Sequence, residues 1–528
     1  MGMRPASFVW AWILVAAAIG CGGSKLGSPT DAADANGFDA PVEPDAGADV
    51  PAGSDASDAH PVVAIPLEHV TSVFPPRGGA GVCTDAPLRL FFDTPPVTGA
   101  GGKIQVFDVD SATPVDSIDI AAPLTFQAIG GRNYFYKPII ISGNEAYIYL
   151  RKVLKPGVKY YVNIDPGVFL AGPGGPPIGA VNDTETWRFQ VRAAAPAAGA
   201  SRVTVTADGS GDFCTVQGAV DYVPASNTAP VTISVAAGTY REIVAMQTKH
   251  SVTVRGEDRN ASIISYPNNG ALQIPPGTTA SMGTKWRAMF GVDGSNDLLI
   301  ENITLWNPSP QLPTDGQSEV LRIEGGARSV VRNATIKGTQ DTLLMSGQVY
   351  IANSIIEGNV DFVWGNDAVF FDHCEIKVVG RKGYNVQARN AVGAMGYVFV
   401  DCNLTADPGI VGHVLARTNK NVGLVGSMVA YLDCTMGPHI DPVGWLIDGS
   451  TRPAPDAGIA DGGAAVDISN LRFWEYHSVD PAGSRIDVSL RIPESRQLTD
   501  AEAAQLRDPA YVLSGWNPKA APADAGTD

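Results

Sequence analysis

A six-residue pattern recurs along the second half of the chain, and it limits the possible folds more than any other feature. In each copy an apolar and a polar residue precede a turn-forming residue, and a small, a polar and an apolar residue follow it. The turn-forming position falls at Asn302, Asn333, Asn353, His373, Asp401 and Asp433. The steps between copies are 31, 20, 20, 28 and 32 residues, which is typical of one coil repeated along an axis with insertions. The pattern therefore predicts a right-handed parallel β-helix.

Three cysteines come directly after a turn-forming residue of this pattern, at Cys374, Cys402 and Cys434. Stacked coils would place them in one internal row, where buried thiols are expected to pack rather than to react. His373 belongs to the same ladder of coils and is interpreted as structural. No Cys or His cluster in the chain has the spacing of zinc ligands. We therefore expect no metal site and no cofactor.

A chain of 528 residues is too long for one typical domain, so a second folded unit is expected. Between residues 62 and 193, short alternating runs such as Leu88–Phe92 and Lys159–Ile164 are separated by Gly, Pro and Asn, and they predict a small β-sandwich. The β-helix is expected at residues 200–516 and a disordered tail at 517–528. The predicted fold class is thus all-β.

The N-terminal residues indicate export. Residues 1–20 combine Arg4 with an apolar stretch and predict a secretory signal peptide rather than a membrane-spanning helix. The segment Ala16–Cys21 resembles a bacterial lipobox, which implies that Cys21 is lipidated in the mature protein. Residues 21–61 are rich in Asp, Ala, Pro and Gly and are expected to form a disordered tether. The expected location is the bacterial cell envelope, with a lipid anchor at the outer membrane, or the exterior.

The formal net charge of −17 argues against a nucleic-acid partner, because no basic patch or RNA-reading motif accompanies it. A densely anionic substrate is also disfavoured, whereas a methyl-esterified polyuronide is locally neutral. A long solenoid joined to one small domain is expected to be a monomer.

Two aspartates, Asp341 and Asp361, lie 20 residues apart, which is the coil length in this part of the chain. Residues one coil apart stack at roughly 4.8 Å, so the two carboxylates should face each other. Two like charges at that distance raise the apparent pKa of one member and leave a proton available at neutral pH. One aspartate could then donate a proton while the other attacks. The alternative is a ladder of stacked acids that only satisfies turns.

The stretch from Val203 to Gly515 resembles the pectin methylesterase family in motifs that follow the family's order. The motifs are Val203–Phe213, Gly238–Glu242, Gln317–Leu321, Gln340–Leu343, Asp361–Gly365 and Ser495–Thr499, the last preceded by Phe473–Tyr476. The earlier segment resembles bacterial immunoglobulin-like modules in Tyr160–Val162 and Thr186–Phe189. By itself such a module would be a spacer or a weak binding module.

The resemblance implies a role for each residue that matches a family motif. Asp361 matches the nucleophile that attacks the ester carbonyl, and Asp341 matches the general acid that protonates methanol and then activates water. Gln317 and Gln340 match the amide donors that stabilise the oxyanion. Arg417 matches the arginine that hydrogen-bonds the nucleophile and holds it ionised. The implied substrate is methyl-esterified pectin or a related polyuronide.

The match is weaker among residues that contact substrate. Trp445 resembles an aromatic that lines the sugar-binding cleft, with a packed core tryptophan as the competing interpretation. Phe362, from the motif that follows Asp361, is placed with it as a substrate-binding residue. Asn419 and Asp448 stand where the family has tryptophans. These replacements preserve the ester hydrolase prediction and weaken the pectin prediction.

Other functions remain open at this stage. An esterase or thioesterase acting on a non-pectic acyl substrate is favoured by the missing aromatics. A non-catalytic polysaccharide-binding surface protein would also suit both folds, although it has no need of two Asp, two Gln and Arg417. A pectate lyase would require a calcium site of clustered acids near a basic residue, and no convincing one is present in the sequence. A serine hydrolase is disfavoured because no Gly-x-Ser-x-Gly motif occurs.

Overall fold

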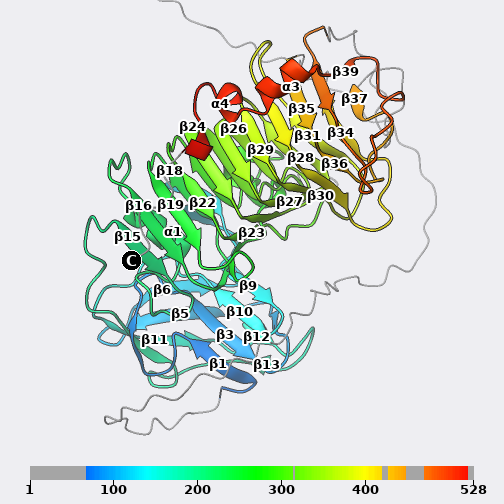
Figure 1. Cartoon of the computed structure of the whole chain (residues 1–528). Helices are drawn as coiled ribbons and strands as arrows, with labels where there is room; N and C mark the ends of the chain where they lie inside the picture. Colours follow the sequence, from blue (N-terminus) through cyan, green and yellow to red (C-terminus); the bar gives the residue numbers. More distant parts are fainter. Residues whose placement is uncertain (1–66, 313–315, 419–425, 448–468, 521–528) are drawn as a thin grey trace, which may run out of the picture. The chain divides into compact units, whose positions relative to one another are not determined.

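A computed structural model describes residues 67–312, 316–418, 426–447 and 469–520 (Figure 1). Within these ranges strands dominate and helices are short, which confirms the predicted all-β class. The signal peptide, the tether, Cys21, Asn419 and Asp448 lie outside the described residues. None of the helices in the described part of the chain is long and apolar enough to cross a membrane.

Two facing sheets form a β-sandwich between Val70 and Val191. One sheet has the strand order β1 (Val70–Phe74), β3 (Leu88–Phe92), β10 (Glu145–Ile148), β9 (Ile139–Ser142). The other has the order β2 (Gly79–Val82), β14 (Arg188–Val191), β11 (Lys159–Ile164), β5 (Lys103–Asp108), β6 (Pro114–Asp119). A small third sheet joins β13 (Pro177–Ile178), β12 (Phe169–Leu170) and β4 (Val97–Thr98). Alternate residues of β3 and β11 are buried in one shared core, as the period-two pattern predicts.

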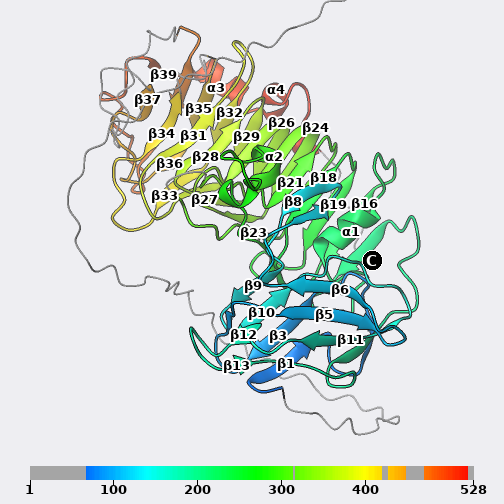
Figure 2. The ribbon, with the colours of Figure 1, turned by 180° about the vertical axis from the view of Figure 1, so that it is seen from behind.

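A separate hairpin, β7 (Phe126–Ile129) and β8 (Arg132–Phe135), leaves the sandwich between β6 and β9. Its turn, Gly130-Gly131, has φ angles of +54° and +82°. A Cβ atom at Gly130 would lie 2.0 Å from the carbonyl oxygen of Ala245 in the β-helix, so only glycine fits there. Figure 2 shows β8 beside strands of the β-helix. The side chains of Ile129 and Tyr134 accordingly belong to the core of the β-helix rather than to that of the sandwich.

Residues 202–497 form a parallel β-helix made of two long parallel sheets. The larger sheet contains β15 (Arg202–Val205), β16 (Val231–Val235), β18 (Val244–Gln247), β19 (Val252–Gly256), β21 (Phe290–Asp293), β22 (Leu299–Glu301), β24 (Leu321–Arg332), β26 (Leu343–Ala352), β28 (Val360–Gly365), β29 (Val369–Asp372), β31 (Tyr384–Ala388), β32 (Tyr397–Val400), β34 (Val414–Thr418), β35 (Met428–Leu432), β37 (Trp445–Ile447), β38 (Arg472–Tyr476) and β39 (Ser495–Gln497). The smaller contains β17 (Gly238–Tyr240), β20 (Ser262–Ser265), β23 (Thr304–Trp306), β25 (Thr335–Lys337), β27 (Ile355–Gly358), β30 (Glu375–Val378), β33 (Asn403–Ala406) and β36 (Thr435–Met436).

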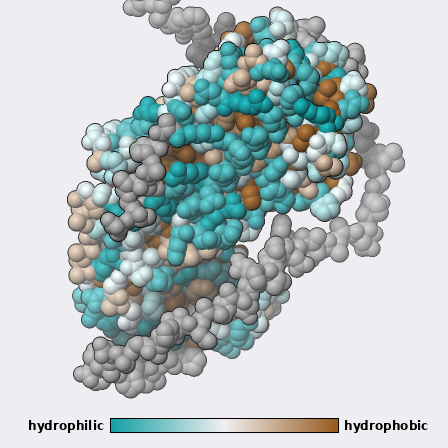
Figure 3. All heavy atoms as spheres, in the orientation of Figure 1, coloured by the Kyte–Doolittle hydropathy of each residue, from teal (hydrophilic) through white to brown (hydrophobic). Residues whose placement is uncertain are grey.

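Six short helices complete the described chain: α1 (Val216–Tyr222), η1 (Ala271–Gln273), α2 (Thr284–Arg287), α3 (Asp500–Leu506), α4 (Pro509–Val512) and η3 (Pro518–Ala520). Helices α3 and α4 cover the sheet near β29 and β35, where Leu506 and Val512 pack against Phe370 and Ala430 (Figure 1). Lys519 of η3 forms an ion pair with Asp372 at 2.6 Å. The face of the molecule in Figure 3 is largely hydrophilic, with apolar residues scattered over it.

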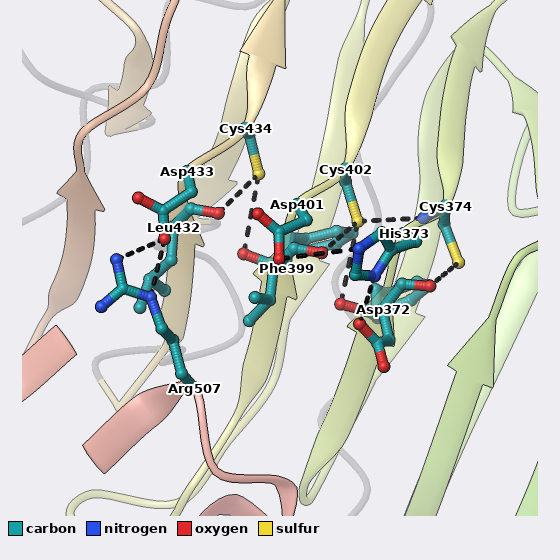
Figure 4. A network of polar contacts seen from close by, with 12 residues as sticks. Asp372, His373, Cys374, Phe399, Asp401, Cys402, Leu432, Asp433, Cys434 and Arg507 are labelled. Atoms are coloured by element: carbon teal, nitrogen blue, oxygen red, sulfur yellow. Dashed lines mark hydrogen bonds and ion pairs between the residues drawn. The ribbon is translucent and has the colours of Figure 1, made fainter. Parts of the chain in front are cut away.

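The six turn-forming residues of the repeated pattern have positive φ angles, from +47° at Asn333 to +54° at Asn302. Asn and Asp tolerate this conformation better than most residues, which explains their use at the turn. The cysteines that follow form the predicted internal row: Cys374, Cys402 and Cys434 are buried, and the Cys374 N–H donates to Cys402 Sγ at 3.4 Å (Figure 4). The His373 ring instead lies on the outside, against Asp372 at 2.7 Å.

A disulfide between Cys83 and Cys214 joins the sandwich to the first coil of the β-helix, with the two Cα atoms 5.8 Å apart. The sequence alone does not reveal this pair, because 131 residues separate the two cysteines. Asp85 lies beside it and accepts hydrogen bonds from the Cys214 and Thr215 N–H groups at 3.0 and 2.9 Å. The carboxylate thus adds a second bond between sandwich and β-helix at this end.

Candidate active site

Asp341 and Asp361 occupy the same position in neighbouring coils. Gln340 pairs with Val360 and Leu343 with Val363 in parallel register, so a step of 20 residues relates the two aspartates. The Asp341 N–H donates to the carbonyl of Val360 at 3.1 Å. Both aspartates have positive φ angles, +62° and +46°, and only 7% and 6% of their surface is exposed. Non-glycine residues in this conformation are uncommon and concentrate at functional sites.

The Asp361 carboxylate is held by two side chains from later coils. Arg417 of β34 donates from Nε to Oδ1 at 2.8 Å and from Nη2 to Oδ2, forming a two-pronged ion pair. Gln387 of β31 donates from Nε2 to Oδ2 at 3.3 Å. A guanidinium in this geometry favours the ionised carboxylate. These three hydrogen bonds fix the orientation of the Asp361 carboxylate.

Asp341 has a different environment. Its Oδ2 accepts a hydrogen bond from Arg287 Nη2 at 3.0 Å, but that guanidinium also pairs with Glu319 at 2.8 Å. Burial raises the pKa of Asp341 well above its usual range, and the charges of Glu319 and Asp361 add to the rise, whereas Arg287 and Arg389 oppose it. Of the two aspartates, Asp341 is therefore the one whose surroundings favour the protonated form.

Trp364 and Arg389 lie next to the pair. The Arg389 guanidinium is 4.2 Å from the centre of the Trp364 ring, and Arg287 lies over the same ring at 5.8 Å. Arg389 also donates to Gln387 Oε1 from Nε at 2.9 Å and from Nη2 at 2.5 Å. This bond orients the Gln387 amide so that its Nε2 faces Asp361.

The two glutamines expected in the site lie on coils next to Asp341. Gln340 directly precedes it, and the Ser318 N–H, one residue after Gln317, donates to the Gln340 carbonyl at 3.4 Å. Both side chains are partly exposed. Gln340 Oε1 accepts a hydrogen bond from Gln311 Nε2 at 3.3 Å. The structure therefore brings the side chains of Asp361 and Arg417 together beside Asp341, and it places the backbone of Gln317 and Gln340 next to this group.

It does not bring the two predicted substrate-binding aromatics to the surface. Trp445 is 1% exposed and stacks on Phe473 at 4.7 Å, with its Nε1 donating to Glu475 at 3.0 Å. Phe362 is fully buried in the same core. Trp445 pairs in register with Ala416, an inward-facing residue, so the alternation of the strand directs its ring into the coil. The interpretation as a packed core tryptophan is the correct one.

Five neighbours of the pair were missed by sequence analysis: Arg287, Glu319, Trp364, Gln387 and Arg389. Signals existed for some of them. Trp364 is paired with Gln387 on the neighbouring strand, and Arg417 lies on the strand after that. Aligning all the coils of the sequence would have shown that these three side chains lie in one row on the outside of the sheet. Arg287 lies in an insertion between β20 and β21 that has no repeat position, and no sequence signal marks it.

A parallel β-helix with two stacked carboxyl groups, one with a raised pKa and the other in a two-pronged ion pair with Arg417, is suited to a hydrolase that combines an acid with a carboxylate nucleophile. The pectinesterase family model matches residues 202–454. Pectinesterase 31 of Arabidopsis thaliana is 31% identical over 317 residues, covering 59% of this chain and 92% of that protein. The chain belongs to the pectinesterase family and is a carboxylic ester hydrolase.

Other comparisons give similar values. Pectinesterase 2 of Olea europaea is 31% identical over 314 residues, covering 57% of this chain and 76% of that protein. The solved structure of pectin methylesterase from carrot is 25% identical with a TM-score of 0.49, covering 59% of this chain and 93% of that one. The family match begins at residue 202, so the β-sandwich lies outside it.

Proposed function

We propose that this hydrolase removes methyl esters from pectin, with Asp361 as nucleophile and Asp341 as acid and then base. The observation that carries the proposal is the contrast within the aspartate pair: Arg417 forms a two-pronged ion pair with Asp361, whereas burial and the charge of Glu319 raise the pKa of Asp341. When two stacked carboxyl groups have such different surroundings, one is suited to be the acid and the other the nucleophile. The family membership supports the substrate class.

In the first half of the reaction an Asp361 oxygen attacks the ester carbonyl carbon, and the carbonyl oxygen becomes an oxyanion. The amides of Gln317 and Gln340 are suited to donate hydrogen bonds to that oxygen. The carbon–methoxy bond then breaks as Asp341 gives its proton to the methoxy oxygen. Methanol leaves, and the acyl group stays on Asp361 as an anhydride.

In the second half, Asp341 is a carboxylate and accepts a proton from water. The resulting hydroxide oxygen attacks the acyl carbon, the bond to Asp361 breaks, and a free uronate carboxylate leaves. Both aspartates return to their starting protonation states. One acidic proton is released overall, because the product carboxylic acid ionises at neutral pH.

A second substrate class is favoured by one observation. Trp445 and Phe362 are buried, and Asn419 and Asp448 stand where the family has tryptophans. A cleft with fewer aromatic faces offers less stacking area to a sugar. Hydrolysis of a non-pectic ester by the same two aspartates is therefore the alternative.

The test is methanol release from highly methyl-esterified pectin by the exported part of the chain, residues 62–528. The Asp361→Ala variant should lose activity, while Asp401→Asn, in an exposed turn, should retain it. Release by wild type and by the Asp401 variant only supports both substrate and nucleophile. Hydrolysis of an aryl ester in an Asp361-dependent manner without methanol release from pectin would favour the alternative, and inactivity on every ester would refute the proposed function.

We also propose that the sandwich is an immunoglobulin-like module. Its strand orders β1-β3-β10-β9 and β2-β14-β11-β5-β6 correspond to the A-B-E-D and G-F-C arrangements of that fold, with β2 and β6 as added edge strands. The parallel pairing of β2 with β14 follows from a first strand that changes sheets after Phe74. An experimental structure of residues 62–193 in which these strands pair differently would refute the assignment.

We propose, from the N-terminal sequence alone, that the protein is exported and anchored through a lipid on Cys21. We also propose a monomer, because the chain is a long solenoid joined to one small domain. Incorporation of labelled fatty acid into wild type but not into Cys21→Ala is the expected result. Equal labelling of the two proteins would refute the anchor.

A further inference from the structure

Arg287 lies in the active site but belongs to an irregular segment of the chain. It contacts both Asp341 and Glu319, yet it is the last residue of a helix of only four residues, α2. This helix lacks a side-chain cap, because its N-cap residue is Gly283. Helices this short are unstable by themselves. The surrounding segment, residues 266–289, contains one further short helix, η1, and lies between two strands of the β-helix. Contacts beyond this short helix must therefore hold Arg287 in place.

A chain of buried hydrogen bonds provides such contacts. Asn268 Nδ2 donates to the carbonyls of Trp286 and Ala288 at 2.8 and 2.9 Å and so fixes the backbone on both sides of Arg287. Asn268 Oδ1 in turn accepts a hydrogen bond from Gln273 Nε2 at 2.9 Å. Both amide side chains are fully buried, where an unpaired polar group is costly and the geometry is correspondingly strict.

The chain ends on the hairpin of the sandwich. Gln273 Nε2 also donates to the carbonyl of Phe135 at 2.8 Å, and Gln273 Oε1 accepts from the Phe135 N–H at 3.0 Å. The Tyr134 hydroxyl donates to the carbonyl of Lys285 at 3.2 Å. Arg132 forms an ion pair with Asp293 at 2.5 Å, which anchors β8 to β21.

We propose that the β7–β8 hairpin is a working part of the esterase site, because through Gln273 and Asn268 it positions Arg287 against Asp341. The sandwich is then more than a spacer: without its hairpin, Arg287 would lose part of the support that keeps its guanidinium between Glu319 and Asp341, while the bonds of Asn268 to Asn307 and Ser309 would remain. This inference rests on the proposed function, since it assigns Asp341 the role of general acid. Arg287 is a positioning residue rather than a catalytic one.

Loosening Arg287 has a defined effect on the acid. Asp341 is faced by Glu319, Arg287, Asp361 and Arg389. Arg287 lowers the pKa of Asp341 directly and also neutralises Glu319, which raises it. Displacement of Arg287 therefore raises the pKa of Asp341. The acid stays protonated to higher pH, and the alkaline limb of kcat/KM should move upward.

The experiment uses Gln273→Leu, which removes the bonds to Phe135 and Asn268. We expect kcat/KM on methyl-esterified pectin to fall by about tenfold, in line with misplacement of a site group by a fraction of an ångström, and the alkaline limb to move to higher pH. Arg287→Gln should cause the same changes. In the double variant the Gln273 substitution should have no further effect, because it acts through Arg287.

Asp85→Asn is the matched control, since it weakens a different bond between sandwich and β-helix. It should lower the melting temperature without moving the pH profile. Tyr134→Phe, which loses the hydroxyl's bond to Lys285 and its contact with Arg132, should give a smaller shift in the same direction as Gln273→Leu and keeps the test decisive if the latter fails to fold.

An active wild type whose pH profile is unchanged in Gln273→Leu and Tyr134→Phe would overturn the inference. So would effects of Gln273 and Arg287 that multiply in the double variant. Failure of the proposed function is distinguishable, because the wild type itself would then release no methanol.

Discussion

Two regions build the candidate site in different ways. Asp341, Asp361, Gln387 and Arg417 lie on successive coils of the larger sheet, so strand register places them. Arg287 instead lies on the inserted segment 266–289, which the sandwich hairpin holds by hydrogen bonds. The coils position the nucleophile and its arginine, whereas the insertion supplies one of the charges around the acid, Arg287. The comparison teaches that a repeat determines where two carboxyl groups meet but not which of them carries the proton.

The largest effect is expected on the coil side. Arg417→Ala should reduce kcat/KM on methyl-esterified pectin by about a hundredfold or more, as removal of a fixed electrostatic partner in a water-poor site commonly does. The reason is that Asp361 would lose both guanidinium bonds and keep only the Gln387 amide. Arg507→Ala, which removes an ion pair with Asp433 far along the coil (Figure 4), is the control and should keep kcat/KM within about twofold. A mild loss at Arg417 would mean that the coils alone do not hold the nucleophile.

Much of this coil side could be predicted from the sequence. The spacing of Asn333, Asn353 and His373 gives the coil length, and the coil length brings Asp341 onto Asp361. Short-range periodicity carries that information because each strand repeats the previous one. It was harder to predict which residues of a strand face outward. Trp445 was expected in the cleft, but the alternation along β37 directs its side chain into the coil.

The insertion side could not be predicted. Arg287 and Gln273 occupy no repeat position, and their contacts depend on a hairpin more than 130 residues earlier in the chain. The disulfide between Cys83 and Cys214 could not be predicted for the same reason, since the two cysteines are 131 positions apart in the sequence. Contacts between distant irregular segments leave no periodic trace in a single sequence.

Glu319→Gln tests how the charges around Asp341 set its pKa. Its charge raises the pKa of Asp341, and its loss also leaves Arg287 to interact with Asp341 alone. Both changes lower the pKa of Asp341, so the alkaline limb of kcat/KM should move to lower pH, opposite to the shift in Arg287→Gln. Profiles measured between about pH 5 and pH 10 bracket the two shifts. Shifts of the same sign in both variants would show that this pair does not set the acid.

The same contrast predicts opposite changes in stability. The folded-state pKa of Asp341 is raised, so its stabilising contribution is present below its unfolded pKa of about 3.9 and is lost as pH rises through the folded value. Asp341→Asn should therefore raise the melting temperature at alkaline pH by a few degrees, roughly 2–4 °C per kcal/mol, and by less in acid. Asp361→Asn should lower it, because Arg417 loses a charged partner. Thermal unfolding at several pH values decides between these outcomes.

The smallest effect concerns two tryptophans on opposite faces of the same sheet, Trp364 in β28 and Trp445 in β37. Trp445→Phe keeps an aromatic ring against Phe473 and loses one hydrogen bond to Glu475, which costs about 1 to 3 kcal/mol for a charged acceptor. It should lower the melting temperature and leave KM within about twofold, since a hydrogen bond inside the core does not contact substrate. Trp364→Phe is the matched variant on the outward row, where the ring lies under Arg287 and Arg389.

Because the ring of Trp364 supports the two guanidiniums that act on Asp341, its replacement should lower kcat/KM several-fold with little change in melting temperature. A large rise in KM for Trp445→Phe would place that residue in the cleft and would restore the aromatic contact expected from the sequence. If the two variants changed kcat/KM and the melting temperature equally, the inward and outward rows would not differ in function. This part of the β-helix would then not be divided into a packed interior and a reactive outer face.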